Sequence, residues 1–203
     1  STDGGIIWDN ITHNLNAMPI RTVVIDHTAD KNIYLGAEIG IYKMPWNNNV
    51  YELWSDNMPT TTIEELEIVY GSNMLKAATW GRGLWERCLD GRDGFPKITK
   101  VEASVKPSDT RPTNIENVSI AIDIDNIEDV SSAYLNYSLN NLDLDETISM
   151  SRFNKEQYKL DDYLPLGSAN DKLYFKVYAI NTSGDTTETY RYMYTLREDI
   201  GIC

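Results

Sequence analysis

The sequence lacks an excess of basic residues and any long apolar run. Its 203 residues include 31 acidic and 18 basic side chains, a net charge of −13. Binding to a phosphate backbone needs the opposite sign, so the charge argues against nucleic acid as a partner. No stretch approaches the roughly 18 apolar residues that a membrane-spanning helix needs, so we expect no membrane span.

Residues that commonly carry chemistry are also scarce. The two cysteines, Cys88 and Cys203, stand 115 positions apart, which is neither metal-ligand spacing nor a redox C-x-x-C. His13 and His27 have no cysteine or carboxylate at ligand spacing. The chain has no H-E-x-x-H, no glycine-rich phosphate loop and no G-x-S-x-G. We predict no cofactor, and the sequence leaves open whether the parent protein is an enzyme.

Strand-forming residues are abundant. Thirteen tyrosines and five tryptophans accompany short β-branched runs bounded by Gly, Pro, Asn or Asp. This pattern predicts an all-β fold. The stretch "DGRDGFPK" at 90–97 reads as a linker, which divides the chain into domains 1–95 and 96–203.

The first domain contains an internal repeat. Trp8 and Tyr51 stand 43 positions apart, as do Gly40 and Gly83, and "AMPI" recurs as "NMPT". Propeller blades of four strands span about 40–45 residues. The repeat therefore predicts one full blade over 20–56, three strands of another blade over 63–89, and no convincing helix.

The opening "STDGGIIW" fits S-x-D-x-G-x-x-W through Ser1, Asp3, Gly5 and Trp8. Asp3 can accept backbone N–H groups of its own turn, Gly5 can take a positive φ, and Trp8 can pack between sheets. This pattern resembles the Asp-box of sialidase-repeat (BNR) propellers. The region is similar to the closing blades of secreted bacterial propellers of the sortilin-like or xyloglucanase-like kind. The resemblance implies that the box joins the third and fourth strands of a blade, with residues 1–13 supplying an outer strand.

The second domain shows cleaner alternation between apolar and polar residues. "VSIAIDID" and "LYFKVYAIN" each place apolar residues on one face, and "TYRYMYTL" places three tyrosines on one face. "FKVYAINTSG" also resembles a fibronectin type III stretch. Seven short strands over about 105 residues predict an Ig/fibronectin III-like β-sandwich. The apolar positions and the fibronectin-like residues are Val118, Ile120, Ile122, Ile124, Leu173, Phe175, Val177, Ala179, Asn181, Gly184, Tyr190, Tyr192 and Tyr194.

Several residues are weak candidates for a site. Exposed tryptophans can stack on sugar rings, which nominates Trp46 and Trp80. Glycoside hydrolysis needs two acids across the scissile bond, and Glu38 lies beside a strand-to-strand turn. The acidic stretch "DIDNIED" makes Asp123 and Asp125 calcium candidates, although the EF-hand pattern is absent. Glu64, Glu65 and Glu67 lie near a strand entry, and a solvated acidic surface explains these acids and Glu38 better than a catalytic pair does.

The resemblance has implications for location and partners. It implies a secreted or cell-surface protein, exported by a type IX-like route, although "REDIGIC" shows no sorting domain. In a secreted chain, Cys88 and Cys203 would pair, closing a loop that restricts the unfolded chain by roughly 4–5 kcal/mol. Because a propeller needs four to eight blades, the missing blades would come from a larger parent or another chain.

Three functions remain open from the sequence. The first is a non-catalytic C-terminal part of a larger protein, with the propeller binding a protein or glycan and the sandwich acting as spacer or cap. The second is one wall of a glycoside hydrolase cleft. The third is a structural or adhesin module.

Overall fold

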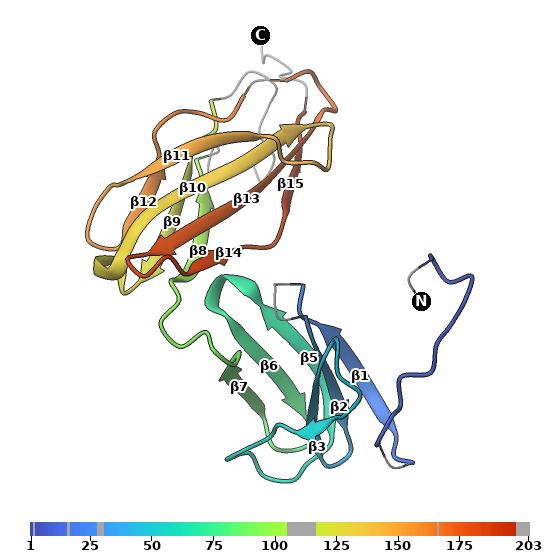
Figure 1. Cartoon of the computed structure of the whole chain (residues 1–203). Coiled ribbons are helices and arrows are strands. Elements are labelled where there is room, and N and C mark those ends of the chain that lie inside the picture. Colours follow the sequence, from blue (N-terminus) through green and yellow to red (C-terminus); the bar gives the residue numbers. More distant parts are fainter. Residues whose placement is uncertain (2, 16, 28–30, 105–116, 166, 198–203) are drawn as a thin grey trace. The chain divides into compact units, whose positions relative to one another are not determined.

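A computed structural model describes residues 1, 3–15, 17–27, 31–104, 117–165 and 167–197 (Figure 1). The chain divides into two compact units. The first comprises Ser1–Ile68 and Met74–Leu89, and the second comprises Val69–Asn73 and the chain from Asp90 onward. Regular structure in the described residues consists of β-strands and two 3₁₀ turns, so the predicted all-β class is confirmed.

The first unit begins with a four-stranded antiparallel sheet. Its strands are β1 (Ile20–Ile25), β2 (Asn32–Ala37), β3 (Gly40–Pro45) and β4 (Glu52–Leu53), paired in chain order. Each strand pairs with its sequence neighbour, and the short turn "AEIG" connects β2 to β3. Four strands thus lie within 20–56, where the repeat predicts them.

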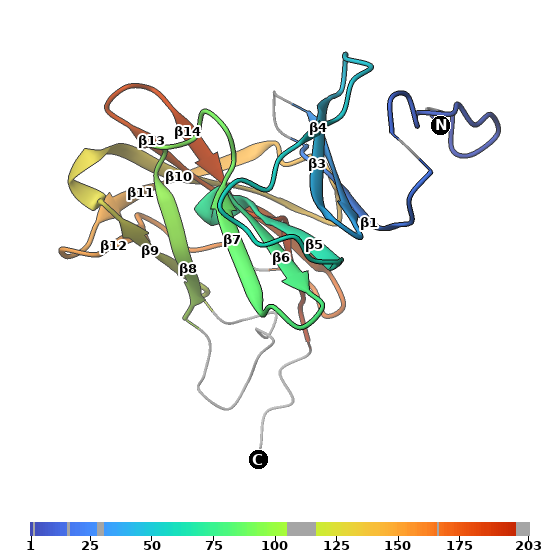
Figure 2. The same ribbon diagram turned by 90° about the horizontal axis from the view of Figure 1, so that it is seen from below.

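A second sheet in this unit has three strands, seen from below in Figure 2. They are β5 (Ile63–Val69), β6 (Met74–Thr79) and β7 (Leu84–Cys88), in the order β5-β6-β7. The 3₁₀ turn η1 (Tyr70–Ser72) connects β5 to β6 and belongs to the second unit. Three strands over 63–89 are therefore observed, as predicted.

The two sheets pack closely where β2 lacks a side chain. A Cβ on Gly36 would lie 2.5 Å from Thr22 Cγ2 and 2.7 Å from Ile63 Cγ2. The backbone N–H of Leu66 on β5 donates to Thr22 Oγ1 of β1 at 3.3 Å. Only glycine allows this approach of the sheets at position 36.

The N-terminal segment differs from the prediction. The described residues of 1–13 form no strand, and the Trp8 side chain is 77% exposed. The expected outer strand and the packing of Trp8 between sheets were therefore wrong for this chain. No strand of the described sheets pairs with this segment, and the indole is left largely exposed.

The second unit contains one sheet of eight strands. Its order is β14-β13-β10-β11-β12-β9-β8, and β15 also pairs with β13. The short 3₁₀ turn η2 (Ile127–Asp129) connects β9 to β10. The strands are β8 (Lys97–Ala103), β9 (Ile120–Asp125), β10 (Val130–Leu139), β11 (Glu146–Arg152), β12 (Gln157–Leu160), β13 (Lys172–Asn181), β14 (Thr186–Glu188) and β15 (Tyr192–Thr195).

This sheet curls around a single core. Buried residues of β8, β9 and β12 belong to the same cluster as those of β10 and β13. The alternation read from the sequence is confirmed, because Ile120, Ile122 and Ile124 are all buried while Asp125 is exposed. The core-facing residues of β13 are likewise buried, and Tyr192 stacks on Phe175 with ring centroids 5.1 Å apart.

The predicted linker is held by the second unit. Arg92 is 8% exposed and its Nη1 donates to Asn73 Oδ1 at 3.2 Å. Asn181 Nδ2 donates to the Gly94 carbonyl at 3.0 Å. The glycine, proline and charge content suggested a loose connection, but these hydrogen bonds fix its course.

Candidate functional site

The segment that carries the Asp-box pattern closes on itself through hydrogen bonds of its own side chains. Asp3 Oδ1 accepts the Ser1 hydroxyl at 2.7 Å and the backbone N–H groups of Ile6 and Ile7 at 3.0 and 3.1 Å. Ser1 Oγ in turn accepts the N–H of Gly5, whose φ is 93°. The indole N–H of Trp8 donates to the Gly5 carbonyl at 3.0 Å. All four box residues therefore contribute to one closed turn.

These hydrogen bonds predict a shifted titration of Asp3. The Ser1 hydroxyl first, and then the Ile7 and Ile6 N–H groups, stabilise the carboxylate and lower its pKa below the ordinary aspartate value. The hydrogen bonds of the turn should therefore stabilise it fully at a pH above the pKa of Asp3 in the unfolded chain. This stabilisation should be lost as the pH falls through the lower pKa that Asp3 has in the folded chain. A ¹³C-carboxyl NMR titration of Ser1→Ala should show the Asp3 pKa rising toward the value of an ordinary aspartate side chain.

Asp171 supplies the internal reference for that titration. Its pKa is also lowered, by the Asn140 amide and the Ser168 N–H, and neither group touches the Asp-box. An unchanged Asp3 value in Ser1→Ala, or an equal change at Asp171, would contradict the assignment of the shift to Ser1.

Two turns of the first unit meet at one end. The Thr62 hydroxyl donates to the Glu38 carbonyl at 3.4 Å, and the Trp80 N–H donates to the Thr62 carbonyl at 2.9 Å. Thr61 Oγ1 also donates to the Trp80 carbonyl at 3.1 Å. The β2–β3 turn that carries Glu38 is therefore linked through residues 61–62 to the β6–β7 turn that carries Trp80.

This end presents large apolar side chains to solvent. Trp80 and Leu84 are 74% and 83% exposed, and Ile39 is 46% exposed. Gly81 and Gly83 hold positive φ angles of 74° and 76°, which bend the β6–β7 turn tightly. We name the Glu38–Ile39 and Trp80–Leu84 turns together the turn face. Contiguous exposed apolar side chains commonly mark an interaction surface.

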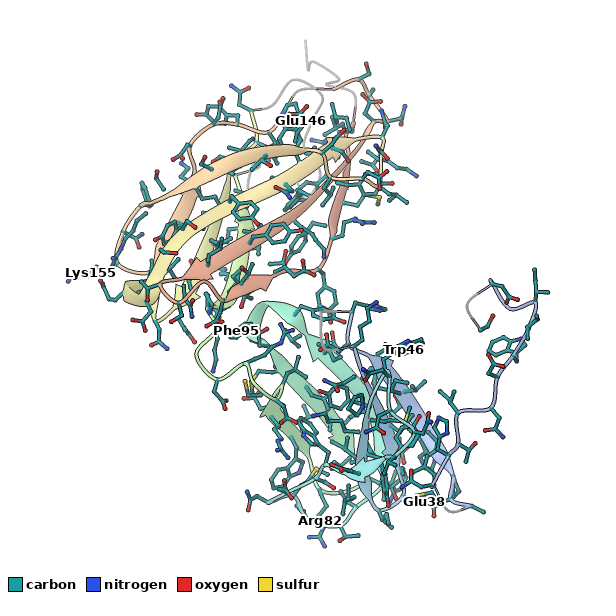
Figure 3. The ribbon with its side chains drawn as sticks, in the orientation of Figure 1. Glu38, Trp46, Arg82, Phe95, Glu146 and Lys155 are labelled. Carbon is teal, nitrogen blue, oxygen red and sulfur yellow. The ribbon has the colours of Figure 1, made fainter. Side chains whose placement is uncertain are left out.

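The candidates from the sequence are not all brought together. Glu38 lies on the turn face with Trp80, and Arg82 of the same turn lies at that end in Figure 3. Trp46 lies at the opposite end of the first sheet, because it follows the far end of β3 (Figure 3). The backbone N–H of Trp46 donates to the Lys31 carbonyl at 3.0 Å, and the Trp46 side chain is 50% exposed.

Sequence reasoning missed an aromatic pocket between the two sheets of the first unit. The Arg87 guanidinium lies 4.0 Å from the Trp54 ring centroid, and its Nη1 pairs with Asp56 Oδ2 at 3.2 Å. Trp85 and Met58 also line the cavity, whose volume is about 50 Å³. This cavity is far smaller than the roughly 300–1,000 Å³ of small-molecule binding sites. No local sequence pattern indicates this pocket, since Trp54 reaches it only through the pairing of β3 with β4.

The acidic candidates are dispersed. Glu64 lies 3.6 Å from Arg21, and Asp123 Oδ1 accepts the Gln157 amide at 2.7 Å. No group of three or more His, Cys, Asp or Glu side chains able to hold a metal ion occurs within the described ranges. Calcium at Asp123 and Asp125 stays a prediction.

Cys88 is half-buried and Cys203 lies outside the described residues, so their disulfide also stays a prediction.

Comparison with known proteins gave distant structural similarities only. Neither a protein-family model nor a curated protein matches the chain. Two solved structures are similar in part: the extracellular domains of the putative one-component and hybrid two-component systems BT4673 from B. thetaiotaomicron. The identities are 9% and 10%, the TM-scores 0.28 and 0.31, and the coverage 88% and 91% of this chain. The chain spans a quarter of the length of each, and similarity at this level supports no assignment.

No helix in the part of the chain that the structure describes has both the length and the apolar character to cross a membrane.

Proposed function

We propose that the first unit is the closing part of an Asp-box β-propeller that binds a protein or a glycan without catalysing a reaction. The observation that carries this proposal is the Asp-box turn, in which Asp3 accepts three hydrogen bonds from within the motif. The four spaced residues Ser1, Asp3, Gly5 and Trp8 all contribute hydrogen-bonding atoms to this turn. The four-stranded meander β1–β4 beside the three strands β5–β7 has the size of one blade and most of another.

The exposed side of the first sheet supports a proposal for the location of the missing blades. Val23 and Ile25 on β1 are 56% and 38% exposed, whereas Thr22 faces Gly36 and the second sheet. Alternation along a strand puts Val23 and Ile25 on the opposite face from Thr22. Leu15 and Tyr51 already pack over the β2 and β3 part of this face. We propose that a preceding blade of a larger, secreted or cell-surface parent covers its β1 part.

The second unit is proposed to be a fibronectin III-like sandwich. β8, β9 and β12 would form one layer, and β11, β10 and β13 with β14 and β15 the other. The support for this division is the single core that the sheet encloses, although β11 and β12 pair where the layers would meet. In this proposal it acts as a spacer or cap for the propeller. A hydrolase cleft and a purely structural module remain the alternatives.

The turn face provides the test of a non-catalytic binding role. Affinity electrophoresis of the full chain through gels containing xyloglucan or a sialylated mucin should show retardation in at least one of them. Replacing Trp80 with alanine removes an exposed ring and is expected to weaken that retardation about tenfold, equivalent to roughly 1.4 kcal/mol. No reducing ends should be released from either polymer.

Trp46→Ala is the matched control, because it removes an exposed indole at the opposite end of the sheet. Equal losses in Trp46→Ala and Trp80→Ala would show that the turn face is not the binding site. Release of reducing ends that stops in Glu38→Gln would replace the proposal with the hydrolase alternative. Absence of retardation in both gels would contradict glycan binding by the turn face.

A further inference from the structure

The outer face of the second unit's sheet carries a groove along β9. The groove has a volume of about 450 Å³, within the range of small-ligand sites. It arises from the register of three neighbouring strands, which lie side by side in Figure 1. Ala121 on β9 pairs with Glu102 on β8 and with Lys159 on β12. A small residue between two long ones leaves a channel whose floor is the central strand.

Both ends of the groove are fixed by hydrogen bonds. At one end the Gln157 amide donates to Asp123 Oδ1 at 2.7 Å. At the other, Ser104 and Ser119 exchange two hydrogen bonds, from Ser104 N–H to the Ser119 carbonyl and from Ser119 N–H to Ser104 Oγ. The four-residue step from Ser119 to Asp123 spans about 13 Å along a strand. This length accommodates about two or three sugar rings in line.

The groove floor contains a polar group that the described chain does not satisfy. Ser119 is 3% exposed, lines the groove, and its hydroxyl has no hydrogen-bond partner among the described residues. Buried hydroxyls in native proteins nearly always have a partner, and leaving one unpaired carries a free-energy penalty. This oxygen is enclosed by its surroundings, so the exposed side chains of the groove walls are the groups that a ligand can reach.

The two walls differ in chemistry. Glu102 lies on one wall, where it forms an ion pair with Lys100 of the same strand. Lys159 lies on the other, with its Nζ 5.6 Å from the centre of the Phe153 ring, which is 65% exposed. A ligand that spans the groove must therefore donate to a carboxylate and accept from an ammonium, beside a flat aromatic face. Hydroxyl groups do both, since each has one donor and two lone pairs.

We propose that this groove binds a short neutral oligosaccharide. The opposite charges of Glu102 and Lys159 give the groove no strong preference for an ion, and the chain's net charge of −13 disfavours an anionic sugar. An extended peptide has no free strand edge to pair with, because β9 is hydrogen-bonded on both sides, to β8 and β12. The proposal gives the second unit a ligand of its own in addition to its role as a spacer.

The test uses the full chain in ¹H–¹⁵N NMR titrations with cellotriose, xylotriose, mannotriose and maltotriose. At least one should shift the amide signals of Ser119, Ala121 and Gln157, with a dissociation constant in the range of about 0.1 to 10 mM. Trigalacturonic acid, the anionic probe, and trialanine, the peptide probe, should leave these signals in place. If none of the four neutral sugars shifts them at about 10 mM, or if trialanine does, the proposal is wrong.

Three variants locate the site. Ala121→Leu fills the floor of the groove on the solvent side of the sheet, and Phe153→Ala removes the aromatic wall. Each should weaken binding at least about tenfold while the remaining spectrum stays that of the folded chain. Trp80→Ala, in the first unit, should bind as the unaltered chain does. Unchanged affinity in a folded Ala121→Leu protein would overturn the groove assignment, whatever the outcome of binding at the turn face.

Discussion

Asn73→Ala is expected to lower the free energy of unfolding of the second unit by about 3–4 kcal/mol. Asn73 is 1% exposed and its amide Nδ2 donates to Thr187 Oγ1 at 2.7 Å and to the Pro96 carbonyl at 3.3 Å. Its Oδ1 accepts from Arg92 Nη1, so alanine leaves a buried guanidinium nitrogen without this acceptor. The residue also holds a φ of 55°, a left-handed conformation that asparagine tolerates better than alanine.

Urea denaturation separates the two units spectroscopically. All five tryptophans lie between positions 8 and 85, in the first unit, so their fluorescence reports its unfolding. Ten of the thirteen tyrosines lie in the second unit, where Phe175 packs against two of them, so tyrosine near-UV circular dichroism follows mainly that unit. We expect the tyrosine transition of Asn73→Ala to move to lower urea and the tryptophan transition to move much less.

Two further variants assign the cause. Asn73→Gly loses the same hydrogen bonds but accepts a positive φ, so it should be about 1 kcal/mol more stable than Asn73→Ala. Asn140→Ala removes an asparagine of the same backbone conformation (φ 57°) whose hydrogen bonds to Asp171 and Lys172 are exposed, and it should cost about 1–2 kcal/mol. Equal losses at Asn73 and Asn140 would show that burial of the network is not the cause.

The range of an interaction along the chain decided what the sequence could predict. The Asp-box hydrogen bonds join residues two to four positions apart, so a short pattern was enough to anticipate them. The alternation on β9 and β13 is local too, and it predicted which faces are buried. By contrast, the bond from Asn73 to Thr187 joins residues 114 positions apart, and no local pattern announces it.

The candidate sites follow the same division. The sequence indicated exposed tryptophans, but only the hydrogen bonds through Thr62 bring Glu38 and Trp80 to one end, with Trp46 at the other. The groove was missed because it depends on register. The groove needs the small side chain of Ala121 on β9 between the long side chains of Glu102 on β8 and Lys159 on β12. A one-residue slip of any of these strands would break that arrangement.

Gly36→Ala is expected to destabilise the first unit by about 2–4 kcal/mol. Alanine normally suits a strand at least as well as glycine, so propensity alone predicts a small gain. Here the new methyl group would lie 2.5 Å from Thr22 Cγ2 and 2.7 Å from Ile63 Cγ2, closer than carbon atoms approach in folded proteins. The tryptophan-monitored urea transition should therefore move to lower urea, with the tyrosine transition of the second unit largely unchanged.

A second substitution tests whether the contact with Thr22 causes the loss. Thr22→Ser removes Cγ2 but keeps the hydroxyl oxygen that accepts the Leu66 N–H, so it should restore part of the stability of Gly36→Ala. Ile63→Val is the matched control, because valine keeps both the Cβ and the Cγ2 that crowd position 36. We expect a favourable coupling of about 1 kcal/mol or more for Gly36→Ala with Thr22→Ser and none with Ile63→Val. Additive effects in both pairs would mean that the sheets adjust to the methyl group, and that glycine is not what sets their separation.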